Sequence, residues 1–207
     1  MNEDLSHIKS DMKPCAGGHT QKDLDFYHEM LYKYQNDIDM VVTWAGSFGD
    51  VKLLNKLSAS GKYNPLFVTP VENWNYLHKC NLNSGSPCPL DVVKFYIDKG
   101  VSINAQDIYG MTPLHYAMQA KNGDAAMVLL EAGADPNIET YADQGIPLAM
   151  IGGIPDRLDV LKAMLDKGAD VHHPVKNANM SLLDFMKTYF SEEQSLKPVI
   201  ALMEQYA

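Results

Sequence analysis

The chain has 207 residues and a formal net charge of −9 at pH 7, and 46% of its residues are hydrophobic. This composition allows one or two domains with a buried core. The negative charge argues against a sequence-independent nucleic-acid binder, which needs a cationic face to release counterions from phosphates. Three cysteines and no secretion signal favour a reducing compartment, and the longest apolar runs are too short to span a membrane.

The N-terminal part predicts a tail followed by helices. Residues 1–19 are polar and glycine-containing, which predicts a flexible tail. Thr20 is a suitable N-cap for a helix over residues 20–36, where apolar residues recur at spacings of three and four. Two short helical runs follow, and we expect the break between them at residues 46–49.

An internal repeat follows this N-terminal part. Glycines at the ends of the second predicted helices are 33 and 35 residues apart, at Gly100, Gly133 and Gly168. Leucines in the opening turns are 37, 34 and 35 residues apart, at Leu77, Leu114, Leu148 and Leu183. The two markers agree on a period near 34, which is typical of helical repeats that bury their apolar faces only by stacking.

The segment YGMTPLHYAMQAKNGDAAMVLLEAGADPN resembles an ankyrin repeat, in which a Thr-Pro-Leu-His turn precedes two antiparallel helices and a Gly-Ala-Asp exit. The matching structural residues are Thr112, Pro113, Leu114, His115, Gly133, Asp135 and Asn137. The resemblance implies an all-α ankyrin-repeat solenoid of about four to five helix-turn-helix repeats with capping helices. Its expected parts within residues 20–207 are an N-terminal helix and cap repeat (20–70), three repeats (71–104, 105–137 and 138–173) and a C-terminal cap repeat (174–207).

Local chemistry supports this interpretation. Pro113 suits the first helical position, and Thr112 can accept hydrogen bonds from the free N–H groups there. Gly133 suits a left-handed stop after the second helix. The resemblance also implies that His78 and His115, at the turn-histidine position, bond to neighbouring backbone.

Two departures from the family pattern predict local irregularity. In the repeat 105–137 the Asn122-Gly123 turn comes about two residues late, so we expect a long first helix and a short second one. In the next repeat, the Ile-Gly-Gly-Ile-Pro-Asp-Arg stretch at residues 151–157 should break the first helix early.

The sequence contains no phosphate loop followed by lysine, no His-Glu-x-x-His and no Gly-x-Ser-x-Gly. His78, Cys80 and Cys88 resemble part of a zinc site, but no fourth ligand is evident. We therefore expect no metal, no cofactor and no enzymatic activity. The alternative is an enzyme with an unrecognised site in the irregular regions 80–90 or 141–156.

The resemblance implies that the turns before each first helix are exposed fingers that line a concave surface. Exposed aromatic and methionine side chains there would suit partner binding, unless neighbouring fingers bury them. The candidate partner-binding residues are Glu72, Trp74, Ile108, Tyr109, Met111, Gln119, Asp143 and Gln144.

We therefore predict a monomeric, non-catalytic module that binds an unknown protein partner, without nucleic-acid binding or membrane insertion. The chain resembles small ankyrin proteins that intracellular bacteria export into host cells, which implies a cytoplasmic protein or one secreted without a Sec signal. An intracellular inhibitor or immunity protein that neutralises a basic toxin is the alternative, because the −9 charge would suit such a partner.

Overall fold

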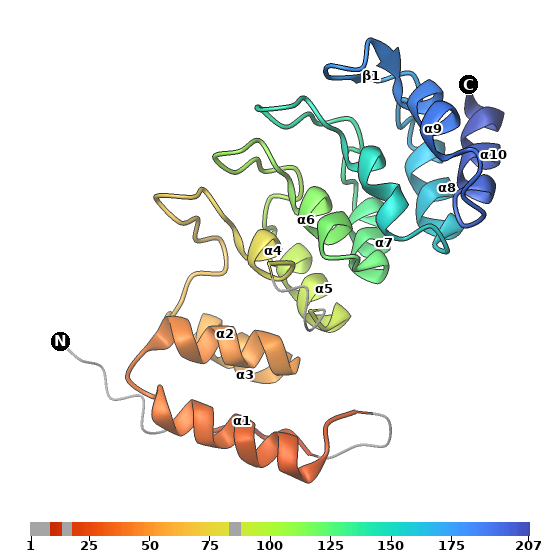
Figure 1. Cartoon of the computed structure of the whole chain (residues 1–207). Helices are drawn as coiled ribbons and strands as arrows, with labels where there is room; N and C mark the ends of the chain where they lie inside the picture. Colours follow the sequence, from red (N-terminus) through yellow and green to blue (C-terminus); the bar gives the residue numbers. More distant parts are fainter. Residues whose placement is uncertain (1–8, 14–17, 83–87) are drawn as a thin grey trace.

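The computed structural model describes residues 9–13, 18–82 and 88–207, which form a curved stack of helix pairs with long loops projecting from one side (Figure 1). The predicted tail, residues 1–19, falls largely outside this described part. The N-terminal helices are α1 (Gln21–Lys33), α2 (Ile38–Phe48) and α3 (Val51–Ala59). The elements of the repeats are α4 (Tyr76–Lys79), α5 (Leu90–Asp98), α6 (Pro113–Gln119), α7 (Gly123–Glu131), the 3-10 helix η1 (Pro147–Gly153) and α8 (Leu158–Asp166). The C-terminal elements are β1 (Pro174–Val175), β2 (Met180–Ser181), α9 (Leu182–Phe190), α10 (Lys197–Met203) and the 3-10 helix η2 (Glu204–Tyr206).

The helices form two rows that run the length of the stack (Figure 1). In the inner row, α4 packs on α6 and α6 on η1, and in the outer row α5 packs on α7, α7 on α8 and α8 on α10. The α2–α3 pair joins this array through α3 and α5, and α1 packs on α2. In the described residues the only strands are the antiparallel pair β1–β2, so the predicted all-α repeat solenoid is confirmed.

Capping residues determine where the N-terminal helices begin and end. Thr20 caps α1 through a reciprocal pair with Asp23, whose carboxylate accepts the Thr20 N–H at 2.8 Å. The break between the next two helices falls at Gly49, the last residue of the expected range 46–49, and Gly46 still lies within α2. The chain reverses at Gly49, which has a φ of +76° in the left-handed region, and Asp50 then caps α3.

The repeat 105–137 and the repeat after it each correct one expectation about helix length. Helix α6 has 7 residues and α7 has 9, so the first helix is the shorter one. The reason is that Lys121 takes a φ of +58°, which ends the helical path, and Asn122 caps α7. In the following repeat the first helix is the 3-10 helix η1, which has 7 residues like α6 and includes Ile151, Gly152 and Gly153. The helix type differs from the expected α-helix, but the expected early break is not found.

The leucines that recur in the opening turns are all buried in the continuous apolar core. Leu77, Leu114 and Leu148 are fully buried, and Leu183 is 5% exposed. Each leucine therefore occupies the same place in successive repeats, where it fills the contact with its neighbours. The period seen in the sequence is the period of this core.

Asparagine side chains tie the exits of successive repeats together. The side-chain oxygen of Asn104 accepts the N–H of Asp135 at 2.9 Å. One repeat later, the side-chain oxygen of Asn137 accepts the N–H of Asp170 at 2.9 Å. The Asp135 carboxylate in turn accepts the Asn137 N–H at 2.9 Å. The motif residues at this end of the repeat thus satisfy backbone groups that would otherwise lack partners.

Candidate functional site

Three loops between the helix pairs project from the same side of the stack (Figure 1). We call residues 64–75, 102–112 and 135–146 finger 1, finger 2 and finger 3. A backbone N–H midway along each finger donates to a carbonyl near its end, in the pairs Thr69–Trp74 at 2.9 Å, Asp107–Met111 at 3.0 Å and Thr140–Gly145 at 3.0 Å. In each pair the side chain of the first residue also accepts the N–H of the second. The three fingers are therefore closed in the same way.

Backbone hydrogen bonds also join each fingertip to the next. The Ile108 N–H donates to the Glu72 carbonyl at 3.1 Å, and the Tyr141 N–H donates to the Tyr109 carbonyl at 2.9 Å. Gly110 permits the second contact, because a Cβ atom at this position would lie 2.7 Å from the Tyr141 nitrogen. The fingers thus form one row at a fixed spacing.

The row ends at finger 1 for a chemical reason. Pro70 follows Thr69 just as Ile108 follows Asp107 and Tyr141 follows Thr140. Proline has no N–H, so finger 1 lacks the donor that fingers 2 and 3 use at this position. The first finger therefore lacks the backbone donor through which another chain could extend the row at this point.

The C-terminal hairpin extends the row beyond finger 3. The Nε2 of His173 lies 2.6 Å from the Gln144 carbonyl, and the Lys176 ammonium donates to the Ala142 carbonyl. The hairpin segment therefore contacts finger 3 through side chains, whereas finger 3 is joined to finger 2 by a backbone hydrogen bond.

The turn histidine of α6 holds finger 3. The Thr112 N–H donates to Nδ1 of His115 at 3.1 Å, so Nδ1 is the unprotonated nitrogen. Nε2 then carries the proton and donates to the Gly145 carbonyl at 3.2 Å. Burial lowers the pKa of His115, which keeps the ring neutral as this arrangement requires.

The histidine of α4 repeats this arrangement one finger earlier. The Asn75 N–H donates to Nδ1 of His78 at 3.1 Å, and Nε2 faces the Met111 carbonyl at 3.2 Å. Burial also lowers the pKa of His78. Each of these histidines therefore joins its own helix start to the closing residue of the next finger.

Trp74 lies half-buried between fingers 1 and 2. Its indole Nε1 is 3.2 Å from the Asp107 carboxylate and 3.1 Å from the Tyr116 hydroxyl, and the rings of Trp74 and Tyr116 are nearly perpendicular at 86°. Tyr116 also donates to Asp107 at 2.7 Å. Because its polar atom is already paired, the indole holds two fingers together and leaves less surface for a partner.

The structure divides the eight candidate binding residues by exposure. The exposed residues are Ile108, Tyr109, Gln119, Asp143 and Gln144, and the half-buried ones are Glu72, Trp74 and Met111. It brings Glu72, Ile108 and Tyr109 together at the linked tips of fingers 1 and 2. Gln119 is the last residue of α6, at the end opposite to the finger, and is therefore apart from the others.

Five further exposed apolar residues on the fingers were not predicted. Four are in finger 1, at Leu66, Phe67, Val68 and Val71, and the fifth is Tyr141 in finger 3. The signal was an apolar run, Leu66 to Val71, without a helical period and interrupted by a proline. With Ile108 and Tyr109 they form a set that we call the fingertip strip: Leu66, Phe67, Val68, Val71, Ile108, Tyr109 and Tyr141.

The residues considered for zinc do not form a metal-binding group in the described part of the chain. Both ring nitrogens of His78 have partners on its own helix start and on finger 2. Over residues 9–13, 18–82 and 88–207, no three His, Cys, Asp or Glu side chains are grouped to hold a metal. The helices of this same part include none long and apolar enough to cross a membrane.

Comparison with known proteins agrees with this geometry. A family model described as ankyrin repeats (3 copies) matches residues 42–140. The chain is 31% identical over 81 residues to an ankyrin repeat protein of fowlpox virus, which covers 39% of this chain and 12% of that protein. It is 33% identical over 88 residues to ankyrin repeat and SOCS box protein 6 of Mus musculus, covering 42% of this chain and 21% of that protein.

A third relative aligns along nearly the whole chain. It is transient receptor potential cation channel subfamily A member 1 of Homo sapiens, at 24% identity over 200 residues, or 96% of this chain and 17% of the channel. In each of these three alignments the matched part is about a fifth or less of the relative's length.

The stacked helix pairs and the linked fingers define a helical-repeat protein. The repeats are ankyrin repeats, as the Thr-Pro-Leu-His motif predicts. Ankyrin repeats imply a protein-interaction module, and the family is generally non-catalytic. The bacterial source stays a prediction.

Proposed function

We propose that this chain is a non-catalytic module that binds a protein partner on its finger row, with the fingertip strip as the main contact. One observation carries the proposal: seven apolar side chains stand exposed on three fingers whose spacing is fixed by backbone hydrogen bonds. Large apolar side chains that are exposed together on neighbouring loops are candidates for a binding surface. Glu72, Trp74 and Met111 are half-buried residues of the same fingers.

The rigidity of the row supports this use. Val71 is 69% exposed, Tyr109 58% and Tyr141 64%, and each lies on a finger closed and linked by backbone bonds. Tyrosine offers a large apolar surface with a polar end, and such residues dominate binding energy at interfaces. Because the fingers are already ordered, binding costs little conformational entropy in the protein.

The charges near the fingertip strip indicate which charges should border the contact surface of a partner. Glu72, Glu139 and Asp143 lie on the same fingers, and the whole chain carries a net charge of −9. We therefore propose a partner with an apolar patch bordered by basic residues, which the acidic surface would attract during encounter. Both a host protein met by an exported effector and a basic toxin or enzyme held by an inhibitor fit this description.

The test is an affinity capture with two matched variants. The finger variant is Val71→Ala, Tyr109→Ala and Tyr141→Ala, and the control variant is Tyr32→Ala and Tyr189→Ala, which removes exposed tyrosines from helices. We expect the wild type and the control to retain the same protein and the finger variant to lose it, with unchanged circular dichroism for all three.

The lysate that supplies the partner then separates the two settings. Capture from the source cell favours the inhibitor, and capture from a candidate host cell favours the effector. A partner that the folded finger variant still retains would show that the fingertip strip is not the binding surface.

A further inference from the structure

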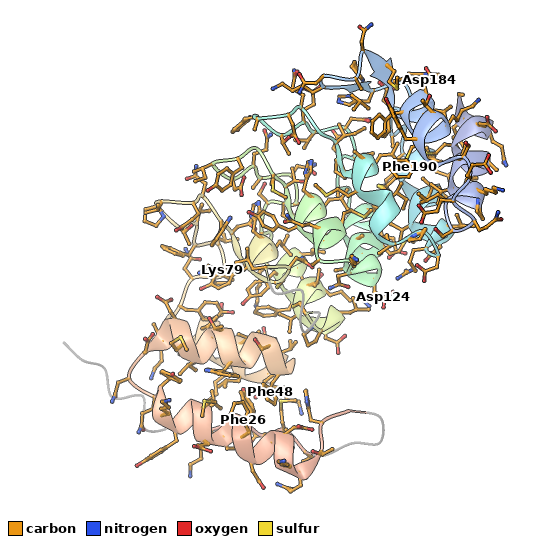
Figure 2. The ribbon with its side chains drawn as sticks, in the orientation of Figure 1. Phe26, Phe48, Lys79, Asp124, Asp184 and Phe190 are labelled. Carbon is orange, nitrogen blue, oxygen red and sulfur yellow. The ribbon has the colours of Figure 1, made fainter. Side chains whose placement is uncertain are left out.

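A cavity of about 400 Å³ lies away from the fingers, between the C-terminal half of α2 and the helices α4 and α5. Its walls are mainly apolar and aromatic, with Phe48, Tyr76, Val92 and Tyr96 among them. Figure 2 labels Phe48 on α2 and Lys79 on α4, which both line this cavity. The proposed function makes no use of this space.

Two thiols share the wall of the cavity. Cys80 is the C-terminal cap of α4, and Cys88 lies two residues before the start of α5 at Leu90. Both are free cysteines, and both are partly buried against the core. Because α4 and α5 pack on each other, the fold holds these two chain positions together.

We propose that Cys80 and Cys88 are a redox modification site that closes to an intramolecular disulfide when the protein meets a low-molecular-weight disulfide such as oxidised glutathione. The shared cavity wall and the packing of α4 on α5 carry the inference. It is independent of partner binding on the fingers.

The reaction is two thiol–disulfide exchanges. A hydrogen bond with Cys88 and burial raise the pKa of the Cys80 thiol, so Cys88 is the better first nucleophile. The Cys88 thiolate attacks one sulfur of oxidised glutathione, the S–S bond breaks, and one glutathione leaves with the proton that Cys88 released. Cys80 then loses its proton and attacks the Cys88 sulfur, and the second glutathione leaves. Two protein thiols are oxidised and one glutathione disulfide is reduced to two thiols.

The disulfide would cross-link the two helices of the first full repeat. It would tie the end of α4 to the start of α5, close to the aromatic wall of Tyr76 and Tyr96, which are stacked at 4.8 Å. Closing a loop removes freedom from the unfolded chain, so the oxidised protein should melt at a higher temperature than the reduced one.

The experiment uses the full chain with Cys15→Ser, which leaves Cys80 and Cys88 as its thiols. The folded protein and the same protein in urea are equilibrated with oxidised and reduced glutathione, quenched with acid, alkylated and digested with trypsin. Lys79 and Lys94 flank both cysteines, so one peptide, residues 80–94, reports the pair. The disulfide form of the peptide carries neither alkyl group, and its mass is lower by two hydrogens than that of the unalkylated dithiol peptide.

We expect the ratio of disulfide to dithiol to be about tenfold higher in the folded protein than in urea, because the fold raises the effective concentration of one thiol near the other. Cys80→Ser and Cys88→Ser variants should form only a mixed disulfide with glutathione. A folded-state ratio equal to or below that in urea, or mixed disulfides at both cysteines without ring closure, would overturn the proposal. The comparison of the Cys15→Ser protein in its folded state and in urea does not depend on how the Cys80→Ser and Cys88→Ser variants fold.

Discussion

The indole Nε1 of Trp74 lies 3.2 Å from the Asp107 carboxylate, so the closing residue of finger 1 is bound to the first residue of the finger 2 turn, 33 positions later. The same carboxylate accepts the Tyr116 hydroxyl and the N–H groups of Tyr109 and Met111. Asp107 is only 1% exposed. One buried charge thus holds the turn of its own finger, the preceding finger and helix α6, and it contributes to the rigidity of the proposed binding surface.

Replacing this carboxylate should cost measurable stability. In Asp107→Asn the amide keeps the shape but places two donors where the four groups around Asp107 need acceptors. We expect the free energy of unfolding to fall by about 1–3 kcal/mol, measured by urea denaturation. Asp98→Asn, at an exposed position on α5, is the matched control and should change it by less than about 0.5 kcal/mol. Equal effects at the two sites would contradict the role assigned to Asp107.

The Asp107 carboxyl also predicts an acid-dependent loss of stability. Burial would raise its pKa, but the hydrogen bonds from Tyr116, Met111, Tyr109 and Trp74 outweigh burial and leave the pKa below its ordinary value of 3.8. The stability this group contributes is complete above that ordinary pKa and is lost as pH falls through the folded-state pKa. The stability difference between wild type and Asp107→Asn should therefore shrink as the pH is lowered below about 4. Urea denaturation of both proteins across this range tests it, and a difference that stays constant would contradict it.

The buried histidines predict a second pH dependence, at higher pH. Burial lowers the pKa of His78 and His115 below 6.5, although the Met111 and Gly145 carbonyls and Asp107 oppose this shift. Both rings are neutral above the unfolded-state pKa, so stability does not change there. As pH falls below about 6.5, the unfolded chain takes up protons that the folded protein does not, and stability is lost until the folded-state pKa is reached.

The slope of this loss is at most about 1.4 kcal/mol per pH unit for each histidine. Urea denaturation between neutral pH and about pH 5 measures it. His115→Gln should reduce the slope, whereas His28→Gln, at an exposed position on α1, should leave it unchanged. A slope that falls equally in both variants would show that the dependence is not specific to the buried ring.

The repeat 105–137, which matches the ankyrin motif best, should lose much stability when a core side chain is truncated. Leu114 is fully buried among the stacked helices, so Leu114→Ala removes contacts and leaves a cavity that the neighbouring repeats cannot fill. We expect a loss of about 2–5 kcal/mol in the free energy of unfolding, measured by urea denaturation. Val71→Ala, on an exposed fingertip, should cost less than about 0.5 kcal/mol. A loss below about 1 kcal/mol for Leu114→Ala would show that this repeat is not tightly packed.

The fold could be predicted because its signals are local and periodic. Thr112, Pro113 and Leu114 each satisfy a requirement of the helix they begin, and the leucine period repeats in the buried core. The surface was only partly predictable. The pairing of Trp74 depends on Asp107 and Tyr116, which come from the next repeat, so the sequence around Trp74 alone cannot distinguish an exposed anchor from a half-buried one.

The exposed run in finger 1 was missed for a related reason. Leu66 to Val71 is as apolar as a core segment, and burial is the usual interpretation of such a run. Its exposure follows from its place at the end of the row, where Pro70 removes the N–H through which a further finger would be joined. That place becomes visible only once the register of the three fingers is known.

The contact between fingers 2 and 3 can be tested with two glycines of nearly equal backbone conformation. Gly110 has a φ of +79° and Gly100 a φ of +81°, so alanine at either position carries a similar backbone strain of about 1–2 kcal/mol. A Cβ at Gly100 meets nothing within 4 Å, whereas a Cβ at Gly110 would lie 2.7 Å from the Tyr141 nitrogen.

Gly110→Ala should therefore cost more stability than Gly100→Ala, by about 1 kcal/mol or more in urea denaturation, because finger 3 must move away from finger 2. Hydrogen exchange at the Tyr141 N–H should accelerate in Gly110→Ala and not in Gly100→Ala, because that N–H bonds to the Tyr109 carbonyl. If both variants lose the same stability and keep the Tyr141 N–H equally protected, the fingertips are not held together by this bond. The rigidity on which the proposed binding surface depends would then need another source.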